Sequence, residues 1–219
     1  MSHFAVWVVG KDIESALAPF DENDRSVLSP IKETKAELKA QFKKYNKDGE
    51  YESFEEFVSE WYGYKKRGKS WFTTYNPKSK WDWYQVGGRY SGRLAKADGI
   101  PCDTALVKEL DFEKMRANAR KRAEGWWEEA QRERPLDAVW LKMAFGIDPG
   151  MTREQYLDKN SRFSAFALLK GGEWYEKGSM GWWGTVSDEK DPDEWARQFD
   201  ALLKSLDPEE RVTIVDCHI

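Results

Sequence analysis

The stretch SRFSAFALLKGGEWYEKG, residues 161–178, carries the clearest signal of secondary structure in this chain. An apolar segment ends at Lys170, and a pair of glycines, Gly171 and Gly172, separates it from a second short segment that contains Trp174. Two consecutive glycines suit the positive φ angles of a tight primed turn. The stretch therefore predicts a β-hairpin of two antiparallel strands.

Segments on both sides of this hairpin predict a further helix and further strands. Asp191 followed by Pro192 is typical of the first turn of a helix. The apolar residues of this helix recur at helical spacing: Trp195, Phe199, Leu202, Leu203 and Leu206. The apolar runs at 4–9 and 211–219 predict two more strands. Asp12 predicts the start of a short helix after the first of them.

The order of these elements indicates the fold class. Strand, helix, strand, strand, helix and strand follow one another, which is the order of a ferredoxin-like split βαβ sheet. We therefore expect an α+β protein with a single domain over 1–219. Residues 1–26 and 161–219 form its core, and a large, mostly helical insertion occupies 27–160, after the first helix.

The insertion contains its own helix signals. The Ser-Pro pair at 29–30 predicts one helix start, and the Ser and Glu of 53–56 form the capping box of another. A third helix is predicted from about 112 to 130, followed by an irregular segment over 134–160. Because no Gly/Ser-rich linker borders the insertion, we expect it to pack on the sheet.

Composition limits the classes of function. The chain has 219 residues, 34% of them charged, and a formal net charge of -4 at pH 7. This balance argues against binding to long nucleic acid, which needs a basic surface. Two cysteines, Cys102 and Cys217, are too few for a disulfide framework. No segment has the pattern of a signal peptide or a membrane span, so we expect a cytoplasmic protein with no membrane partner.

The two ends of the chain carry the first candidate site. In the expected fold the first and last strands are antiparallel neighbours, which brings His3 near Asp216 and His218. His3 and His218 are the only two histidines in the sequence. If the register places all three side chains on one face of the sheet, they form a polar cluster at its corner.

This cluster has three interpretations. The histidines are solvated chain-end residues, or they act as acid and base with Asp216 orienting one of them. In the third, two imidazoles and a carboxylate hold a metal ion. The sequence contains no HxxxH, HExxH or CxxC spacing, so no metal is assigned. As catalytic candidates we take His3, His218 and Asp216.

The second candidate site is KWDWYQVGGRYSG, residues 80–92. Between 76 and 96 the chain has five cations and one anion, Asp82. Guanidinium groups, glycine amides and indole faces suit the phosphate and base of a nucleotide. The candidate ligand-binding residues here are Lys78, Lys80, Trp81, Trp83, Tyr84, Arg89 and Arg93. The segment MGWWGTVSDEK repeats the pattern more weakly and adds Trp182 and Trp183.

Two other interpretations of the 80–92 stretch stay open. It forms a tryptophan-rich hairpin of the core, fixed by Asp82 with Arg89 or Arg93, or it forms a protein interface. GGRYSG matches neither the GxGxxG nor the Walker pattern, and GRYSG is not a GxSxG nucleophile elbow. The sequence therefore identifies no cofactor.

Several motifs resemble one family of proteins encoded by bacteriophages and their bacterial hosts. They are MSHF at 1–4, LAPFDEN at 17–23, NPKSKWDWYQVGGRYSG at 76–92, GGEWYEKGSMGWWGTVSDEK at 171–190 and TIVDCHI at 213–219. Residues 31–70 and 130–160 match poorly. The resemblance implies a phage context rather than a particular reaction, and by analogy a role in counter-defence.

These observations lead to one functional hypothesis and two rivals. We expect a phage-type protein that binds a nucleotide-like, phosphate-bearing ligand, such as a cyclic-nucleotide defence signal. If it is an enzyme, it is a phosphodiesterase-type hydrolase. The rivals are a ligand sponge without catalysis and a protein that inhibits a host defence enzyme. The ligand, the metal requirement and self-association into a homo-oligomer stay open.

Overall fold

The computed structural model describes residues 2–24, 26, 28–132 and 138–219. The chain divides into two compact units. The first, here the sheet unit, comprises Met1–Ala16 and Trp83–Ile219, and the second comprises Leu17–Asp82. The expected insertion boundaries at 27 and 160 differ from these, because the chain beyond Trp83 shares its core with the sheet.

The sheet unit is built on one mixed sheet in the order β10-β9-β1-β13-β5, with β8 also paired to β13. The strands are β1 (His3–Val9), β5 (Trp83–Val86), β8 (Thr104–Leu106), β9 (Ala167–Lys170), β10 (Glu173–Glu176) and β13 (Arg211–His218). β13 is antiparallel to β1 over the whole length of β1. The protein is therefore α+β, as expected.

The ferredoxin-like strand order is not confirmed. That order would place β10, the antiparallel strand of the hairpin, beside β1. Instead β9 lies beside β1 and runs parallel to it. A parallel pair needs a long crossover between its strands, and the chain between Val9 and Ala167 supplies one. The predicted hairpin itself is confirmed: Gly171 and Gly172 join β9 to β10 with φ angles of 61° and 80°.

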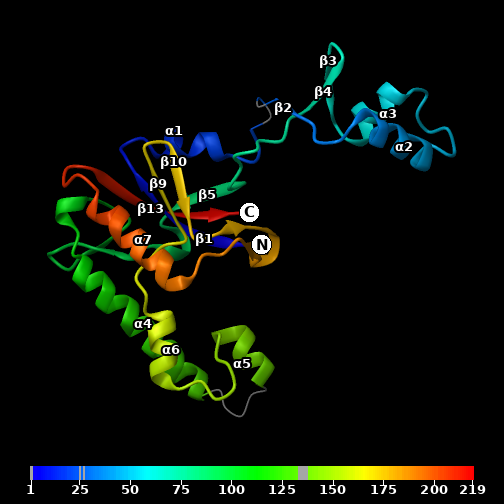
Figure 1. Ribbon diagram of the computed structural model, residues 1–219. Coiled ribbons are helices and arrows are strands. Elements are labelled where there is room, and N and C mark those ends of the chain that lie inside the picture. Colours follow the sequence, from blue (N-terminus) through cyan, green and yellow to red (C-terminus); the bar gives the residue numbers. More distant parts are fainter. Residues whose placement is uncertain (1, 25, 27, 133–137) are drawn as a thin grey trace. The chain divides into compact units, whose positions relative to one another are not determined.

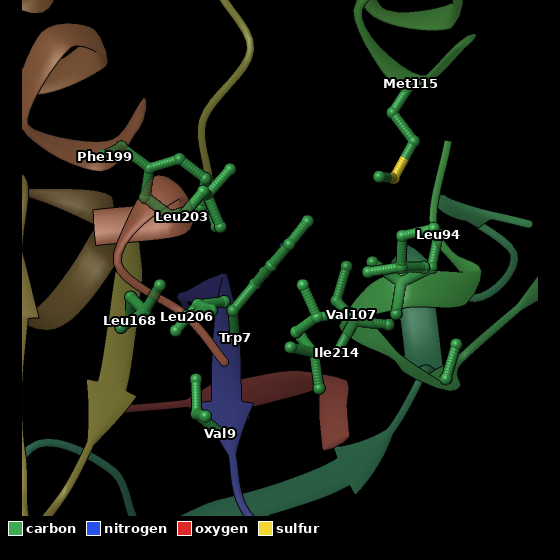
Figure 2. Close-up of a cluster of buried hydrophobic side chains, with 14 of the residues drawn as sticks. Trp7, Val9, Leu94, Val107, Met115, Leu168, Phe199, Leu203, Leu206 and Ile214 are labelled. Atoms are coloured by element: carbon green, nitrogen blue, oxygen red, sulfur yellow. The ribbon is translucent and has the colours of Figure 1, made fainter. Parts of the chain in front are cut away.

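Two helices cover one face of this sheet (Figure 1). They are α7 (Pro192–Lys204) and the first half of α4 (Phe112–Arg132). Asp191 caps α7 as predicted, because its carboxylate accepts the N–H groups of Asp193 and Glu194. Figure 2 shows the apolar side chains between these layers, with Trp7 against Phe199 and Met115 above Leu94.

Two further helices of the sheet unit pack on the second half of α4. They are α5 (Ala138–Phe145) and α6 (Arg153–Asn160), and their core includes Leu141 and Tyr156. The prediction of an irregular segment over 134–160 is therefore wrong for the two helices but correct for 146–152, which form a loop; 134–137 lie outside the described residues. A capping box between Thr152 and Gln155 begins α6.

Short elements complete the sheet unit. They are α1 (Ile13–Leu17), whose last residue belongs to the second unit, β6 (Leu94–Ala95), β7 (Pro101–Cys102), β11 (Ser179–Met180), β12 (Val186–Ser187) and the 3-10 turns η2 (Gly88–Tyr90), η3 (Val107–Glu109) and η4 (Trp182–Gly184). The carboxylate of Asp12 accepts the N–H of Ser15 at the start of α1. No helix in the described ranges is long and apolar enough to cross a membrane.

The unit Leu17–Asp82 is a small α+β module. Its elements are η1 (Ala18–Phe20), β2 (Ser29–Pro30), α2 (Lys35–Tyr45), α3 (Phe54–Trp61), β3 (Lys65–Arg67) and β4 (Ser70–Thr73). The capping box at 53–56 is confirmed. The helix start at 29–30 is wrong: those residues pair with β4, and Thr34 caps α2 instead.

Candidate functional site

The register of β1 and β13 places three candidate residues on one face of the sheet. His3 lies opposite His218, and Ala5 lies opposite Asp216. Because alternate residues of a strand share a face, the side chains of His3, Asp216 and His218 point to the same side. Hydrogen bonds between the backbones of Ser2 and Ile219 close this end of the sheet. The register is therefore the one that the sequence required for a polar cluster of these three residues.

Asp216 holds the imidazole of His3. Its Oδ1 lies 2.9 Å from Nδ1 of His3, and its Oδ2 accepts the backbone N–H of Arg89 at 3.0 Å. The Asp216 side chain is 2% exposed, while that of His3 is 14% exposed. A buried carboxylate needs such partners to offset its lost hydration. With Nδ1 bound to Asp216, Nε2 is the His3 nitrogen available to a ligand.

His218 and Trp83 flank His3 on the same face. The ring of His218 meets that of His3 edge-on, with centroids 5.0 Å apart, and Nε2 of His218 is buried. The indole of Trp83, on β5 opposite His218, lies 6.4 Å from the His3 ring and is 50% exposed. Of the two imidazoles, that of His3 is therefore the better placed to meet a ligand.

The glycine pair of the 80–92 stretch allows the loop after β5 to approach β13. Gly88 has a φ angle of 50°, and a Cβ atom there would lie 2.5 Å from Cβ of Asp216. Gly87 is similarly close to Asp103 and donates its N–H to the carbonyl of Ile214. Only glycine fits both the space and the left-handed backbone. The loop is thereby fixed directly over Asp216.

Tyr90 connects this loop to His3, although the sequence analysis did not select it. Its hydroxyl donates to the backbone carbonyl of His3 at 3.1 Å. The guanidinium of Arg93 lies 4.5 Å above the Tyr90 ring. Burial, and then the nearby Asp216 charge, raises the pKa of Tyr90. The phenol therefore stays protonated near neutral pH and can donate its hydrogen bond.

A small cavity of about 50 Å³ opens beside this cluster on the same face of the sheet. Ala5, which pairs with Asp216, contributes to its floor. Three arginines line it: Arg93, Arg122 and Arg162. Arg93 was expected at a phosphate site, whereas Arg122 and Arg162 were not. They come from α4 and from the segment before β9, so no local motif indicates that they meet.

The remaining candidates of the sheet unit take other positions. Arg89 contributes its backbone N–H, while its side chain is exposed. Tyr84 lies opposite Cys217 and so points to the opposite face of the sheet. The structure therefore brings Trp83 and Arg93 to the His3 face but not the ring of Tyr84.

Three candidates belong to the unit Leu17–Asp82. Trp81 is 7% exposed, and its indole N–H donates to the carbonyl of Leu17. The backbone N–H groups of Lys78 and Lys80 bond to Asn76 and Phe20 respectively. The stretch 76–96, which the sequence presents as one basic aromatic loop, thus divides between two units after Asp82.

Trp183 lies in a loop that is tied to the residue before His3. Gly184 donates its N–H to Oγ of Ser2, and the same hydroxyl donates to the carbonyl of Gly181. Trp183 has a φ angle of 63° and is 83% exposed, which is an unusual state for a bulky L-residue. The backbone of Trp182 lies in the same turn, but its side chain lies outside the described residues.

Comparisons with known proteins found no relative of this chain. No protein-family model matches the chain, and neither a curated protein nor a solved structure is significantly similar to it. The described residues also contain no group of three or more His, Cys, Asp and Glu side chains arranged for a metal ion.

Proposed function

We propose that this protein binds a nucleotide-like ligand through phosphate and cleaves a phosphodiester bond in it. One observation carries the proposal: the His3–Asp216 pair and the arginine-lined cavity open on the same face of one sheet. A histidine oriented by a buried carboxylate is suited to proton transfer, and guanidinium groups are suited to phosphate. In line with the phage-like motifs, the ligand is a host defence signal such as a cyclic nucleotide, encountered in the cytoplasm.

The geometry assigns His3 the part of general base. Oδ1 of Asp216 accepts a hydrogen bond from Nδ1–H of His3, which leaves the lone pair of Nε2 to take a proton from an attacking water molecule. The water oxygen forms the new bond to phosphorus, and the bond to the leaving alkoxide breaks. In this proposal His218 enters the step protonated and gives its own proton to that alkoxide, so that His3 ends the step protonated and His218 neutral. Arg93, one of the arginines that line the cavity, holds the ligand through phosphate.

The ligand-sponge alternative keeps the same site without the reaction. The buried Nε2 of His218 favours this alternative, because at most one ring nitrogen of His218 is then open to a ligand. A sponge returns its ligand intact after heat denaturation, whereas an enzyme returns products, so chromatography of the released ligand distinguishes the two.

The proposed function is tested by hydrolysis assays on cyclic dinucleotides and bis(4-nitrophenyl) phosphate. Replacing His3 by Ala removes the general base, so we expect turnover to fall roughly 10²- to 10⁴-fold. Asp216→Asn should lower turnover as well, because the imidazole loses its charged acceptor. Lys11→Ala changes an exposed residue just past the other end of β1 and should leave turnover unchanged. Equal rates in the wild type and His3→Ala would refute catalysis by His3.

A further inference from the structure

We infer that the arginine-lined cavity binds a second phosphate group of the ligand, one that does not react. The inference rests on the proposed function, since it takes the ligand to be nucleotide-like. It narrows the ligand to molecules with two phosphates held a fixed distance apart: linear or cyclic oligonucleotides and nucleoside bisphosphates. A mononucleotide would fill one of the two positions only.

The charges of the side chains that line the cavity indicate that it binds an anion. Arg162 is paired with Asp193, but Arg93 and Arg122 form no ion pair with any carboxylate in the described residues. None of the described residues that line the cavity is acidic. Partial burial and the nearby Arg93 guanidinium lower the pKa of Arg122. A bound phosphate would offset the repulsion between these cations.

The size and shape of the cavity agree with a phosphate group. A single water molecule needs about 10–15 Å³ of such space. The cavity of about 50 Å³ therefore admits a tetrahedral oxyanion but excludes a nucleobase with its sugar. Guanidinium groups bind phosphate oxygens in a bidentate fork. Because Arg93, Arg122 and Arg162 come from three separate segments, a phosphate between them would be held from several sides.

The position of the cavity separates it from the reacting group. Ala5 and Trp7 lie at its floor, and strands rise by about 3.4 Å per residue. The floor therefore begins about 7 Å along β1 from His3. Arg93 stacks on Tyr90, and Tyr90 bonds to the carbonyl of His3, so the two positions are continuous. The two positions are thus close enough for the phosphates of one oligonucleotide or nucleoside bisphosphate to reach both.

Calorimetric titration with inorganic phosphate tests the cavity alone. We expect the Kd to rise at least ten-fold in Arg122→Ala and to stay unchanged in His3→Ala. Lys121→Ala is the matched control, because it removes an exposed cation from the adjacent position of α4. Arg122→Lys should recover part of the affinity, since it keeps the charge but loses the planar fork. Equal losses in Lys121→Ala and Arg122→Ala, or no phosphate binding to the wild type, would overturn the inference.

A second titration tests the two-phosphate ligand. Adenosine 3′,5′-bisphosphate should bind the wild type at least ten-fold more tightly than adenosine 5′-monophosphate, and this advantage should disappear in Arg122→Ala. An equal advantage in both proteins would contradict the inference. Neither titration depends on turnover, so a wild type that binds the bisphosphate but cleaves no diester would refute the proposed reaction and leave the inference standing.

Discussion

Asp216 is the residue on which the candidate site depends. Its two carboxylate oxygens bind different segments, since Oδ1 holds the ring of His3 and Oδ2 holds the backbone of Arg89. The contact is possible because Gly88 has no side chain at the point where the loop passes over β13. The composition of the GGRYSG motif is thereby explained: its glycines allow the backbone to approach the carboxylates of Asp216 and Asp103 rather than a phosphate.

Replacing Gly88 by Ala should therefore be strongly destabilising. The positive φ angle costs about 1–3 kcal/mol for an L-residue, and the overlap with Asp216 should add about 1–3 kcal/mol more. Gly171→Ala is the matched control, because its φ angle is also positive but nothing lies within 4 Å of the added Cβ. Urea titration gives the free energy of unfolding of both variants. Similar losses of unfolding free energy would contradict the close contact between the loop and Asp216.

Among the elements, turns and helix caps were mostly predicted correctly, whereas the strand order of the sheet was predicted only in part. The hairpin turn at Gly171–Gly172 and the cap of α7 at Asp191 were predicted because each depends on neighbours in sequence. The strand that lies beside β1 on the side away from β13 depends on how the chain between Val9 and Ala167 crosses the sheet, and no local pattern encodes that path. The Ser-Pro pair at 29–30 shows the same limit, because pairing with β4 overrides its helix signal.

The inner position of β13 makes a prediction about Cys217. This strand has β1 on one side and β5 and β8 on the other, and the Cys217 side chain is fully buried. Burial, and then the adjacent Asp216 charge, raises the pKa of the thiol far above neutrality. A raised pKa means that the reactive thiolate is scarce until the pH passes well beyond the usual range of a cysteine.

We therefore expect iodoacetamide at pH 8.5 to modify native Cys102 and not Cys217. Burial also raises the pKa of Cys102, so its reaction should be slow, but Cys102 is only partly buried. Peptide mass spectrometry after timed labelling locates the adduct, and labelling in urea provides the control in which both thiols react. Equal rates at the two cysteines of the folded protein would show that β13 is not an inner strand.

At the scale of the whole molecule, the candidate site combines parts that the sequence separates. His3, Asp216 and His218 were predicted to meet because adjacent antiparallel end strands suffice to bring them together. Arg122 and Arg162 were missed because only the packing of α4 and of the segment before β9 brings them to the cavity. Conversely, Trp81 and Trp83 are near neighbours in sequence, yet they belong to different compact units.

Histidine-selective ¹⁵N NMR can show whether Asp216 orients His3 toward a phosphate. The sequence has two histidines, so two ring systems appear. We predict one ring with a protonated Nδ1 that is lost in Asp216→Asn and whose Nε2 resonance moves when adenosine 3′,5′-bisphosphate binds. Binding of the bisphosphate with no change at either ring, or a His3 tautomer that is the same in Asp216→Asn, would contradict the account.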